Sequence, residues 1–315
     1  MSNEPASLPL ESLPLSRHEL DRDYLGRTNP ELFSDLWADP TTRVIMLWKG
    51  DALLAPDGGL ALLTTDALPD YSLRLYLGRS TAAEAPGFPA VAIVVDDAAA
   101  ARLAADPARW GNLRMIATTL TDLEAGLFTT ALALANWHHS HGFSPRTGSA
   151  TDPVDGGWVR RAPGERHDVF PRTDAAIIVG VIDADDRILL GSNAAWESNR
   201  FSLLAGFVEP GESLESAVIR EVFEESGMRV TAPVYLGSQP WPFPASLMVG
   251  FTAHVDASQV STLTPDGAEI LALRWFSRAE LAASLNEISL PGHTSIARAI
   301  LEHWFGGPID DKIDW

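Results

Sequence analysis

The chain has 315 residues, 46% of them hydrophobic, and it contains no cysteine. Its 42 acidic residues outnumber its 23 lysines and arginines, which leaves a formal net charge of −19. This composition excludes disulfides, supplies enough apolar material for two compact domains, and disfavours nonspecific binding to nucleic acid, because an acidic surface repels polyanions.

Nothing in the sequence suggests a membrane protein. The longest apolar runs, such as AAIIVGVI and ALALAN, are too short to span a bilayer. The N-terminus lacks the basic-then-apolar order of a signal peptide. We therefore expect a soluble, cytoplasmic protein with no membrane partner.

The N-terminal part begins with about 40 polar, proline-containing residues, which we expect to pack as a strand-poor lead-in on the N-terminal domain. The apolar runs at 43–50, 71–79 and 90–97 then predict strands, and 122–139 predicts a closing helix. No metal-ligand cluster, nucleophile motif or phosphate loop occurs here. We expect this part to dimerise and to shape a pocket.

The C-terminal part has a different pattern. Residues 175–192 predict two strands joined by an aspartate-rich turn, and residues 200–210 lead into a short helix. Further strands are predicted at 234–241 and 247–255, and a terminal helix at 295–305. Mixed strands with helices on both faces predict an α/β fold, an α/β/α sandwich preceded by a smaller α/β domain.

The short helix carries glutamates on its apolar face. Successive helical residues are rotated by about 100°, so Leu214, Val218 and Val222 form a stripe, and Glu221 and Glu225 fall within about 20° of Leu214. Acidic helices usually turn glutamates to water instead. Unpaired carboxylates facing protein are costly, so this arrangement predicts a cation, and hard cations such as Mg²⁺ or Mn²⁺ bind carboxylates and phosphates together.

The opposite face is polar. Ser213, Ser216 and Arg220 lie on the far side of the helix, and Glu224 lies at its edge. Ser213 is the expected N-cap, but Ser216 three residues later does not complete a capping box.

A glycine-bracketed loop precedes the helix. Gly206 and Gly211 flank a segment that contains Pro210, where the backbone can turn sharply and approach a ligand. Glu212 is expected to pair with Arg220 and fix this loop against the helix, as a scaffold.

The whole segment resembles the signature of the Nudix hydrolases. That signature is Gly, five residues, Glu, seven residues, Arg-Glu, an aliphatic, any residue, Glu-Glu, any residue, Gly and an aliphatic. Every position is filled, by Gly206, Glu212, Arg220, Glu221, Val222, Glu224, Glu225, Gly227 and Met228. The resemblance implies hydrolysis of a nucleoside diphosphate linked to another group.

A second motif narrows the substrate. Residues 238–246 read SQPWPFPAS, in which three prolines stiffen an extended segment bearing Trp241 and Phe243. This segment resembles the mark of the NADH pyrophosphatase branch of the family. Rigid aromatic and amide groups suit a flat nicotinamide or adenine ring. The alternative is that the loop packs a core or an interface, and both roles can hold together.

The resemblance implies a set of site residues. The carbonyl of Ala205 and the side chains of Glu221, Glu225 and Glu269 would hold two or three Mg²⁺ or Mn²⁺ ions, with Glu224 a less certain ligand. Phe207 would stack on adenine. The rest of the dinucleotide pocket would comprise Phe170, Gln239, Pro240, Trp241, Pro242, Phe243, Pro244, Ala245, Ser246 and Ala297. Phe170 stands where the family often has tyrosine, so it offers no hydroxyl.

The implied reaction is metal-assisted hydrolysis. Glu221, Glu224 and Glu225 are the predicted catalytic residues, and either Glu224 or Glu225 takes a proton from water. The substrate would be NADH or NAD⁺, giving nicotinamide mononucleotide and AMP, with NAD-capped RNA as a second substrate and a homodimer as the assembly. Alternatives are an ADP-ribose or other nucleoside diphosphate hydrolase, and a noncatalytic dinucleotide sensor, which the intact carboxylates disfavour.

The segment between the domains departs from the family. The resemblance predicts an N-terminal domain at 1–136, a zinc-ribbon linker at 137–170 and the Nudix domain at 171–315, but Ser144, Thr147, Ala162 and Glu165 occupy the four thiolate positions. Such zinc sites need four cysteine or histidine ligands, so we expect a ribbon without zinc.

Four histidines near the linker offer an alternative zinc site. They are His138, His139, His141 and His167, and their spacing matches no standard zinc site. The simpler interpretation is that they are exposed at a helix end.

Overall fold

The computed structural model describes residues 7–197, 199–258 and 262–311. The chain divides into two compact units. The C-terminal unit comprises Met1–Pro14, Asp174–Pro240 and Ser246–Trp315, and the N-terminal unit comprises Leu15–Thr173 and Trp241–Ala245. The domain boundaries after residues 136 and 170 stay predictions.

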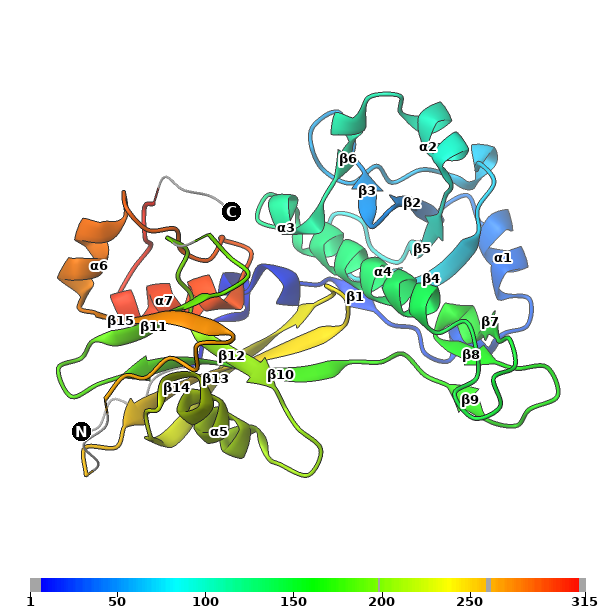
Figure 1. The fold of residues 1–315 in the computed structure, drawn as a ribbon. Helices are drawn as coiled ribbons and strands as arrows, with labels where there is room; N and C mark the ends of the chain where they lie inside the picture. The colour runs from blue at the N-terminus through cyan, green and yellow to red at the C-terminus, as the bar shows by residue number, and fades with distance from the viewer. Residues whose placement is uncertain (1–6, 198, 259–261, 312–315) are drawn as a thin grey trace. The chain divides into compact units, whose positions relative to one another are not determined.

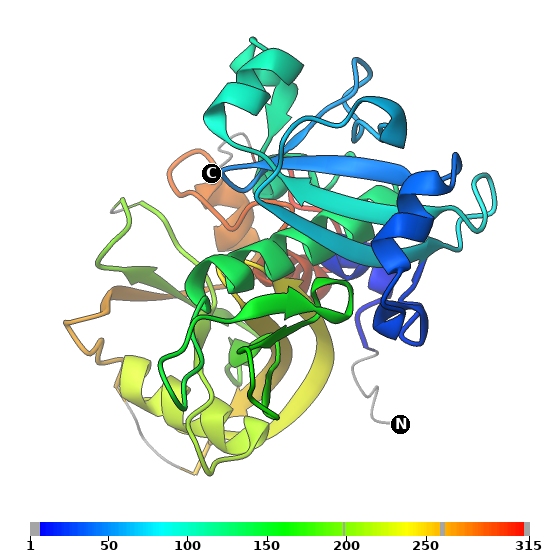
Figure 2. The ribbon, with the colours of Figure 1, turned by 90° about the vertical axis from the view of Figure 1, so that its right-hand side faces the viewer.

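The N-terminal unit is a mixed sheet with helices on both faces (Figures 1 and 2). Its strands are β1 (Leu20–Asp21), β2 (Arg43–Trp48), β3 (Asp51–Leu53), β4 (Leu73–Ser80), β5 (Pro89–Val94) and β6 (Trp110–Gly111), in the order β1-β4-β5-β2-β3-β6. Its helices are α1 (Leu32–Ala38), α2 (Asp97–Leu103), α3 (Leu113–Ile116) and α4 (Asp122–Ser140). The β2–β5 pair is parallel and the other pairs are antiparallel.

The alternation of side chains along the strands divides this core. Leu75 and Leu77 of β4 pack with α4 residues such as Phe128, whereas Tyr76 packs on the other face with α1 residues such as Leu36. The three predicted strands and the predicted helix are confirmed. Sequence patterns missed the short elements β1, β3, β6 and α1 to α3, because two to seven residues give too little periodicity.

The prediction that the N-terminal segment packs on the N-terminal domain is only partly right. Leu8 and Leu13 pack in a core of the C-terminal unit, and the amide of Leu8 donates to the carbonyl of Leu236 at 2.7 Å. The expected packing on the N-terminal domain holds for the residues after Pro14. Two buried leucines in a polar stretch anchor the segment, which its composition alone does not reveal.

The linker is a small ribbon. Strands β7 (Asp152–Val154), β8 (Val159–Arg161) and β9 (Asp168–Val169) form an antiparallel sheet. The Glu165 carboxylate accepts hydrogen bonds from the hydroxyls of Ser144, at 3.2 Å, and of Thr147. Three of the four side chains at the expected thiolate positions, all but that of Ala162, thus meet in hydrogen bonds.

One linker histidine differs from expectation. His138 is buried, its Nε2 donates to the carbonyl of Gly157 at 2.8 Å, and its Nδ1 accepts from Arg160 at 2.8 Å. Burial lowers the pKa of His138 to about 4, so the ring is neutral. The Nε2 hydrogen and the Nδ1 lone pair are therefore both used in hydrogen bonds within the protein.

The C-terminal unit is a second mixed sheet. Its strands are β10 (Asp174–Ile182), β11 (Ile188–Asn193), β12 (Leu204–Phe207), β13 (Val230–Trp241), β14 (Ser246–Val255) and β15 (Ile270–Phe276), in the order β13-β14-β10-β11-β15 with β12 paired to β10. Its helices are α5 (Leu214–Ser226), α6 (Arg278–Ser284) and α7 (Ile296–Phe305). The β10–β14 pair is parallel.

Alternate residues of β10 separate the layers of this unit. Ile177 and Val179 pack with α5, and Ile178 packs with α7 on the other face. The predicted α/β/α sandwich is confirmed, and α5 contacts β12, which pairs with β10. No described helix is long and apolar enough to cross a membrane.

The hydrogen bonds of Glu165 predict a loss of stability when they are removed. Hydrogen bonds to a charged group contribute roughly 1–3 kcal/mol, so Glu165→Ala should lower the free energy of unfolding by about that amount. Arg166→Ala, at an exposed neighbouring position, should change it by less than about 0.5 kcal/mol. Urea unfolding measures both. Equal stabilities, or one zinc per chain in tag-free protein, would refute the hydrogen-bonded ribbon.

Candidate functional site

Helix α5 has defined ends. The Ser213 hydroxyl accepts a hydrogen bond from the amide of Ser216 at 3.1 Å, which confirms the predicted N-cap. At the other end, Gly227 has a φ of +70° and its amide donates to the carbonyl of Phe223 at 2.8 Å. A left-handed residue favours glycine, so the Gly227 of the signature ends the helix.

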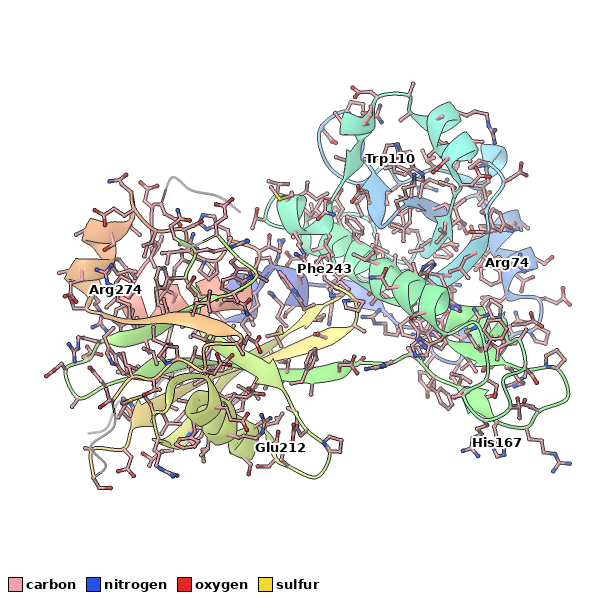
Figure 3. All side chains as sticks on the ribbon, viewed as in Figure 1. Arg74, Trp110, His167, Glu212, Phe243 and Arg274 are labelled. Carbon is pink, nitrogen blue, oxygen red and sulfur yellow. The ribbon has the colours of Figure 1, made fainter. Side chains whose placement is uncertain are left out.

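The loop before α5 is held by one ion pair. Arg220 Nη2 lies 2.6 Å from Glu212 Oε1 and also donates to the carbonyl of Phe207 at 3.0 Å. Glu212 in turn accepts from the amide of Glu209 at 2.8 Å. Figure 3 shows Glu212 beside α5. Hydrogen bonds from Arg220 lower the pKa of Glu212, and the predicted scaffold pair is confirmed.

The three glutamates of α5 differ in exposure. Glu225 is 5% exposed, the side chain of Glu221 is 13% exposed, and that of Glu224 is 56% exposed. The predicted inward orientation of Glu221 and Glu225 is therefore confirmed. Glu224 faces water and pairs with Arg220 at 2.9 Å.

Glu225 is a buried carboxylate without full compensation. Its Oε2 atom is buried and has no hydrogen-bond partner among the described residues. Burial, reinforced by the charges of Glu221 and Glu269, raises the pKa of Glu225 to about 8, against a weaker opposing hydrogen bond from the backbone of Ala205. An orphaned carboxylate oxygen is what a bound cation would satisfy.

Gly206 makes room for the second inward glutamate. A Cβ on Gly206 would lie 2.1 Å from the carboxylate carbon of Glu221, inside any permitted contact. Burial raises the pKa of Glu221, although its Oε1 accepts from Arg220 at 2.8 Å. The first glycine of the signature thus permits a close approach of backbone and carboxylate.

Two further carboxylates lie just before β15. Glu269 precedes the strand, as predicted, and its Oε1 accepts from the Asn193 amide at 3.2 Å. Asp266, which the sequence reasoning missed, accepts from the amides of Ala268 and Ile270 at 3.0 and 2.8 Å. These backbone hydrogen bonds lower the pKa of Asp266, so its negative charge persists beside Glu225. The Asp-Gly pair at a turn was the available sign.

The donor set fits a hard cation. Glu221, Glu225 and Glu269 offer only oxygen acceptors, and the free oxygen of Glu225 faces no competing donor. Among residues 7–197, 199–258 and 262–311, no three or more acidic or histidine side chains are close enough together in this structure to hold a metal ion. One oxygen of Glu221 accepts from Arg220, and one oxygen of Glu269 accepts from the Asn193 side chain.

The residues predicted to line a dinucleotide pocket belong to both units and differ in exposure. Phe207 is 60% exposed beside the glutamates, and Phe170, in the other unit, is 63% exposed. Gln239 is fully buried and its Nε2 donates to the carbonyl of Thr294 at 3.0 Å. Ala297 is buried in α7, so neither Gln239 nor Ala297 offers an exposed side chain.

The proline-rich segment is the tip of the β13–β14 hairpin, and residues 241–245 belong to the N-terminal unit. The rings of Trp241 and Phe243 lie 5.0 Å apart and pack against the core of that unit. The guanidinium of Arg114 lies 4.1 Å from the centre of the Phe243 ring, and Asn136 donates to the carbonyl of Pro242 at 2.8 Å. The packing interpretation of these two rings is confirmed, and their role in recognition stays a prediction.

Two family models match this chain, one in each of its two parts. A NUDIX domain model matches residues 171–297, and a model of the NADH pyrophosphatase-like rudimentary NUDIX domain matches residues 41–137. The NAD-capped RNA hydrolase NudC of Mycobacterium bovis (strain BCG / Pasteur 1173P2) is 45% identical over 208 residues, 63% of this chain and 66% of that protein. The match thus spans just under two thirds of that relative.

Two further proteins match with lower sequence identity and over less of the chain. The Homo sapiens NAD-capped RNA hydrolase NUDT12 is 35% identical over 199 residues, 59% of this chain and 42% of that protein. A crystal structure of a NUDIX hydrolase from Nitrosomonas europaea is 22% identical, with a TM-score of 0.42, and covers 53% of this chain and 94% of its own.

Glu225 predicts how stability depends on pH in metal-free protein. Its pKa is about 8 when folded and near the ordinary 4.5 when unfolded, so between these values only the folded state holds the proton. This contribution is complete below about pH 4.5 and is lost as the pH rises through about 8. Unfolding in urea with EDTA should therefore show stability that falls from about pH 5 to pH 8, by roughly 1 kcal/mol or more.

The matched variant is Glu225→Gln, which keeps the shape and cannot titrate. Its stability should decline less over the same pH range. Parallel curves for the two proteins would contradict the raised pKa of Glu225.

Proposed function

Because the chain belongs to the Nudix family, we propose that it hydrolyses the diphosphate bond of NADH or NAD⁺ and releases AMP with reduced or oxidised nicotinamide mononucleotide. The observation that carries this proposal is the buried, unpartnered oxygen of Glu225 beside the carboxylates of Glu221 and Glu269. That arrangement has little value to stability and suits a site that binds cations and diphosphate.

Members of this family use divalent metal ions, and we propose Mg²⁺ or Mn²⁺ here. Glu221, Glu225, Glu269 and the carbonyl of Ala205 are the proposed ligands for two or three ions. Bound there, the ions would neutralise the diphosphate and acidify a water molecule.

Between the two predicted proton acceptors, the geometry favours Glu225. Its carboxylate is buried among the other acidic groups, whereas Glu224 is more than half exposed and paired with Arg220. A group that accepts a proton must lie within hydrogen-bond reach of the reacting water. We therefore assign the proton transfer to Glu225 and a supporting role to Glu224.

The substrate rings need flat partners. The Phe207 ring is exposed next to the carboxylates and can stack on adenine, as proposed from the sequence. Trp241 and Phe243 stay the residues predicted from the sequence for the nicotinamide part.

We extend the proposal to NAD caps on RNA, because the relatives named above are NAD-capped RNA hydrolases and such a cap presents the same diphosphate. The net charge of −19 predicts weak affinity for the RNA body. Cytoplasmic location and homodimeric assembly stay predictions from the sequence.

A second candidate is hydrolysis of ADP-ribose or another nucleoside diphosphate derivative. The observation that favours it is the packing of Trp241 and Phe243 in a core, because packed rings present less surface to nicotinamide. A noncatalytic sensor is disfavoured, because the carboxylates of the site are all present and those of Glu221 and Glu225 are oriented inward.

Replacement of Glu225 tests the reaction. Glu225→Gln should lower kcat for NADH by at least about 10³-fold, because it removes a carboxylate that is both a proposed metal ligand and the proposed proton acceptor. The matched control is Glu215→Gln, an exposed glutamate in the first turn of the same helix, which should keep the parent rate. AMP release measured by chromatography compares them, and parental turnover by Glu225→Gln, or turnover in EDTA, refutes the proposal.

Gly206→Ala tests the close approach of the loop to Glu221. The added methyl group must displace the Glu221 carboxylate, so kcat should fall by about 10²-fold or more. Gly307→Ala, where a Cβ meets nothing within 4 Å, is the control and should change little. Both proteins should be checked by thermal unfolding, and a fully active Gly206→Ala protein would show that Glu221 need not occupy its present position.

A panel of substrates orders the preferences. Initial rates with NADH, NAD⁺, ADP-ribose, a diadenosine polyphosphate and NAD-capped RNA, each with Mg²⁺ and with Mn²⁺, should give the highest kcat/KM for NADH. A higher kcat/KM for ADP-ribose would favour the second candidate. Failure to release nicotinamide mononucleotide and 5′-monophosphorylated RNA from NAD-capped RNA would remove the decapping activity alone.

A further inference from the structure

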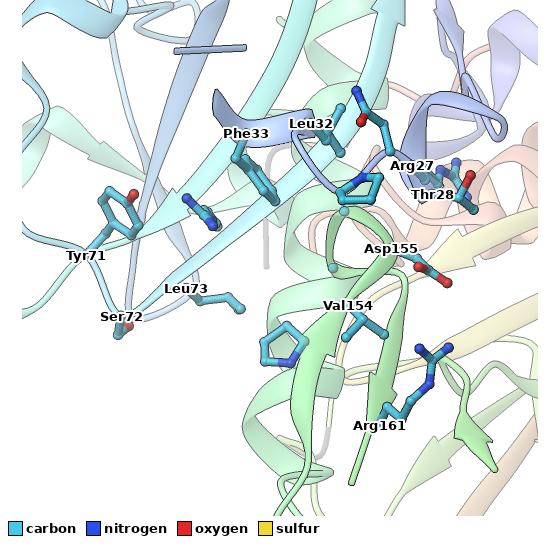
Figure 4. Close-up of a pocket in the computed structure, with 16 residues that line it drawn as sticks. Arg27, Thr28, Leu32, Phe33, Tyr71, Ser72, Leu73, Val154, Asp155 and Arg161 are labelled. Carbon is cyan, nitrogen blue, oxygen red and sulfur yellow. The ribbon is translucent and has the colours of Figure 1, made fainter. Parts of the chain in front are cut away.

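A cavity of about 640 Å³ lies in the N-terminal unit (Figure 4). It is bounded by the turn before α1, by the start of β4 and by the segment that follows β7. Cavities of this size are typical of small-molecule sites. All of its lining residues fall within Leu15–Thr173, so the cavity belongs to one unit.

The lining of the cavity is positively charged, whereas the chain as a whole is negatively charged. Three arginines, Arg27, Arg74 and Arg161, line the cavity with one carboxylate, Asp155. The protein as a whole carries a net charge of −19. A concave surface with the opposite sign focuses a positive field and attracts an anion.

Two of these arginines form no direct ion pair among the described residues, although the charge of Asp23 acts on Arg27. The guanidinium of Arg27 lies 3.6 Å from the centre of the Trp158 ring, and that of Arg74 lies 4.1 Å from the centre of the Phe33 ring. Among the described residues, neither arginine forms an ion pair, whereas Arg161 pairs with Asp168 at 2.6 Å. Stacked guanidinium groups keep their planes fixed and their in-plane donors free, which suits phosphate.

The Arg27 side chain is held by one hydrogen bond and lies against the backbone at Gly156. Arg27 Nε donates to the carbonyl of Arg22 at 3.1 Å, so its terminal donors stay available. A Cβ on Gly156 would lie 3.6 Å from Arg27 Cγ and 3.1 Å from the Cβ of Tyr76. Asp155 has a φ of +49°, a strained conformation for a residue with a side chain, and such strain is concentrated at functional sites.

Aromatic rings complete the cavity. Phe33 and Tyr71 are partly exposed and lie toward one side of the cavity, with Arg27 and Asp155 toward the other (Figure 4). Trp37 contacts both rings, at centroid distances of 6.0 and 6.4 Å. An aromatic face near free arginine donors matches the two parts of a nucleotide, a flat base and a phosphate.

We propose that this cavity is a second nucleotide site, in which Arg27 and Arg74 bind the phosphate and Tyr71 stacks on the base. A free mononucleotide and a segment of single-stranded RNA offer the same chemistry. The inference does not rest on the proposed hydrolysis, because it concerns binding in the N-terminal unit.

The test is calorimetric titration of the full chain in EDTA, which keeps divalent ions from the acidic site. The probes are AMP, adenosine, inorganic phosphate and hexaadenylate. AMP should bind at least 10-fold more tightly than adenosine or phosphate, because only AMP fills both parts of the cavity. Hexaadenylate binding at least 10-fold more tightly than AMP identifies RNA as the source, and equal binding identifies the free nucleotide.

Variants locate the binding. Arg74→Gln, at an exposed position, should weaken AMP binding at least 10-fold, and Arg27→Gln should do the same. Arg102→Gln, an exposed arginine of α2 outside the cavity, should bind like the parent. Thermal unfolding checks that each variant is folded.

Three results would overturn the proposal: no binding of AMP or hexaadenylate to the parent, unchanged AMP binding by Arg74→Gln, or equal affinity for adenosine and AMP. None of them bears on NADH turnover, so the two proposals fail separately.

Discussion

The structure around the acidic site depends on one constraint, the burial of Glu225 without a full set of hydrogen-bond partners. A carboxylate in this position opposes folding unless it is protonated or bound to a cation. Its pKa of about 8 expresses that conflict in the metal-free chain. The neighbouring charges of Glu221 and Glu269 increase the conflict, and a cation would resolve it.

The surrounding elements keep the Glu225 carboxylate buried. The Arg220–Glu212 pair, at 2.6 Å, holds the loop before α5, and Gly206 of β12 lies against the Glu221 carboxylate. On the same face of the helix as the two inward glutamates, Ala217, Val218 and Val222 pack in the core against the sheet. The helix therefore cannot rotate to release Glu225 into water without exposing that apolar face.

Local patterns predicted the parts that depend on neighbours in sequence. Helical spacing gave the inward direction of Glu221 and Glu225, and spacing also gave the Ser213 cap. What depends on tertiary contacts was not predictable. The burial of His138 and the packing of Trp241 each require a partner distant in sequence, such as Gly157 or Arg114, that no periodicity indicates.

The most direct test of this account is the release of protons when Mn²⁺ binds to metal-free protein. Because Glu225 is largely protonated at pH 7 and a bound cation needs it ionised, titration in weakly buffered solution should release close to one proton per chain. The release should vanish at about pH 9.5, where Glu225 is already ionised. Binding of Mn²⁺ at pH 7 with no proton released would contradict the account.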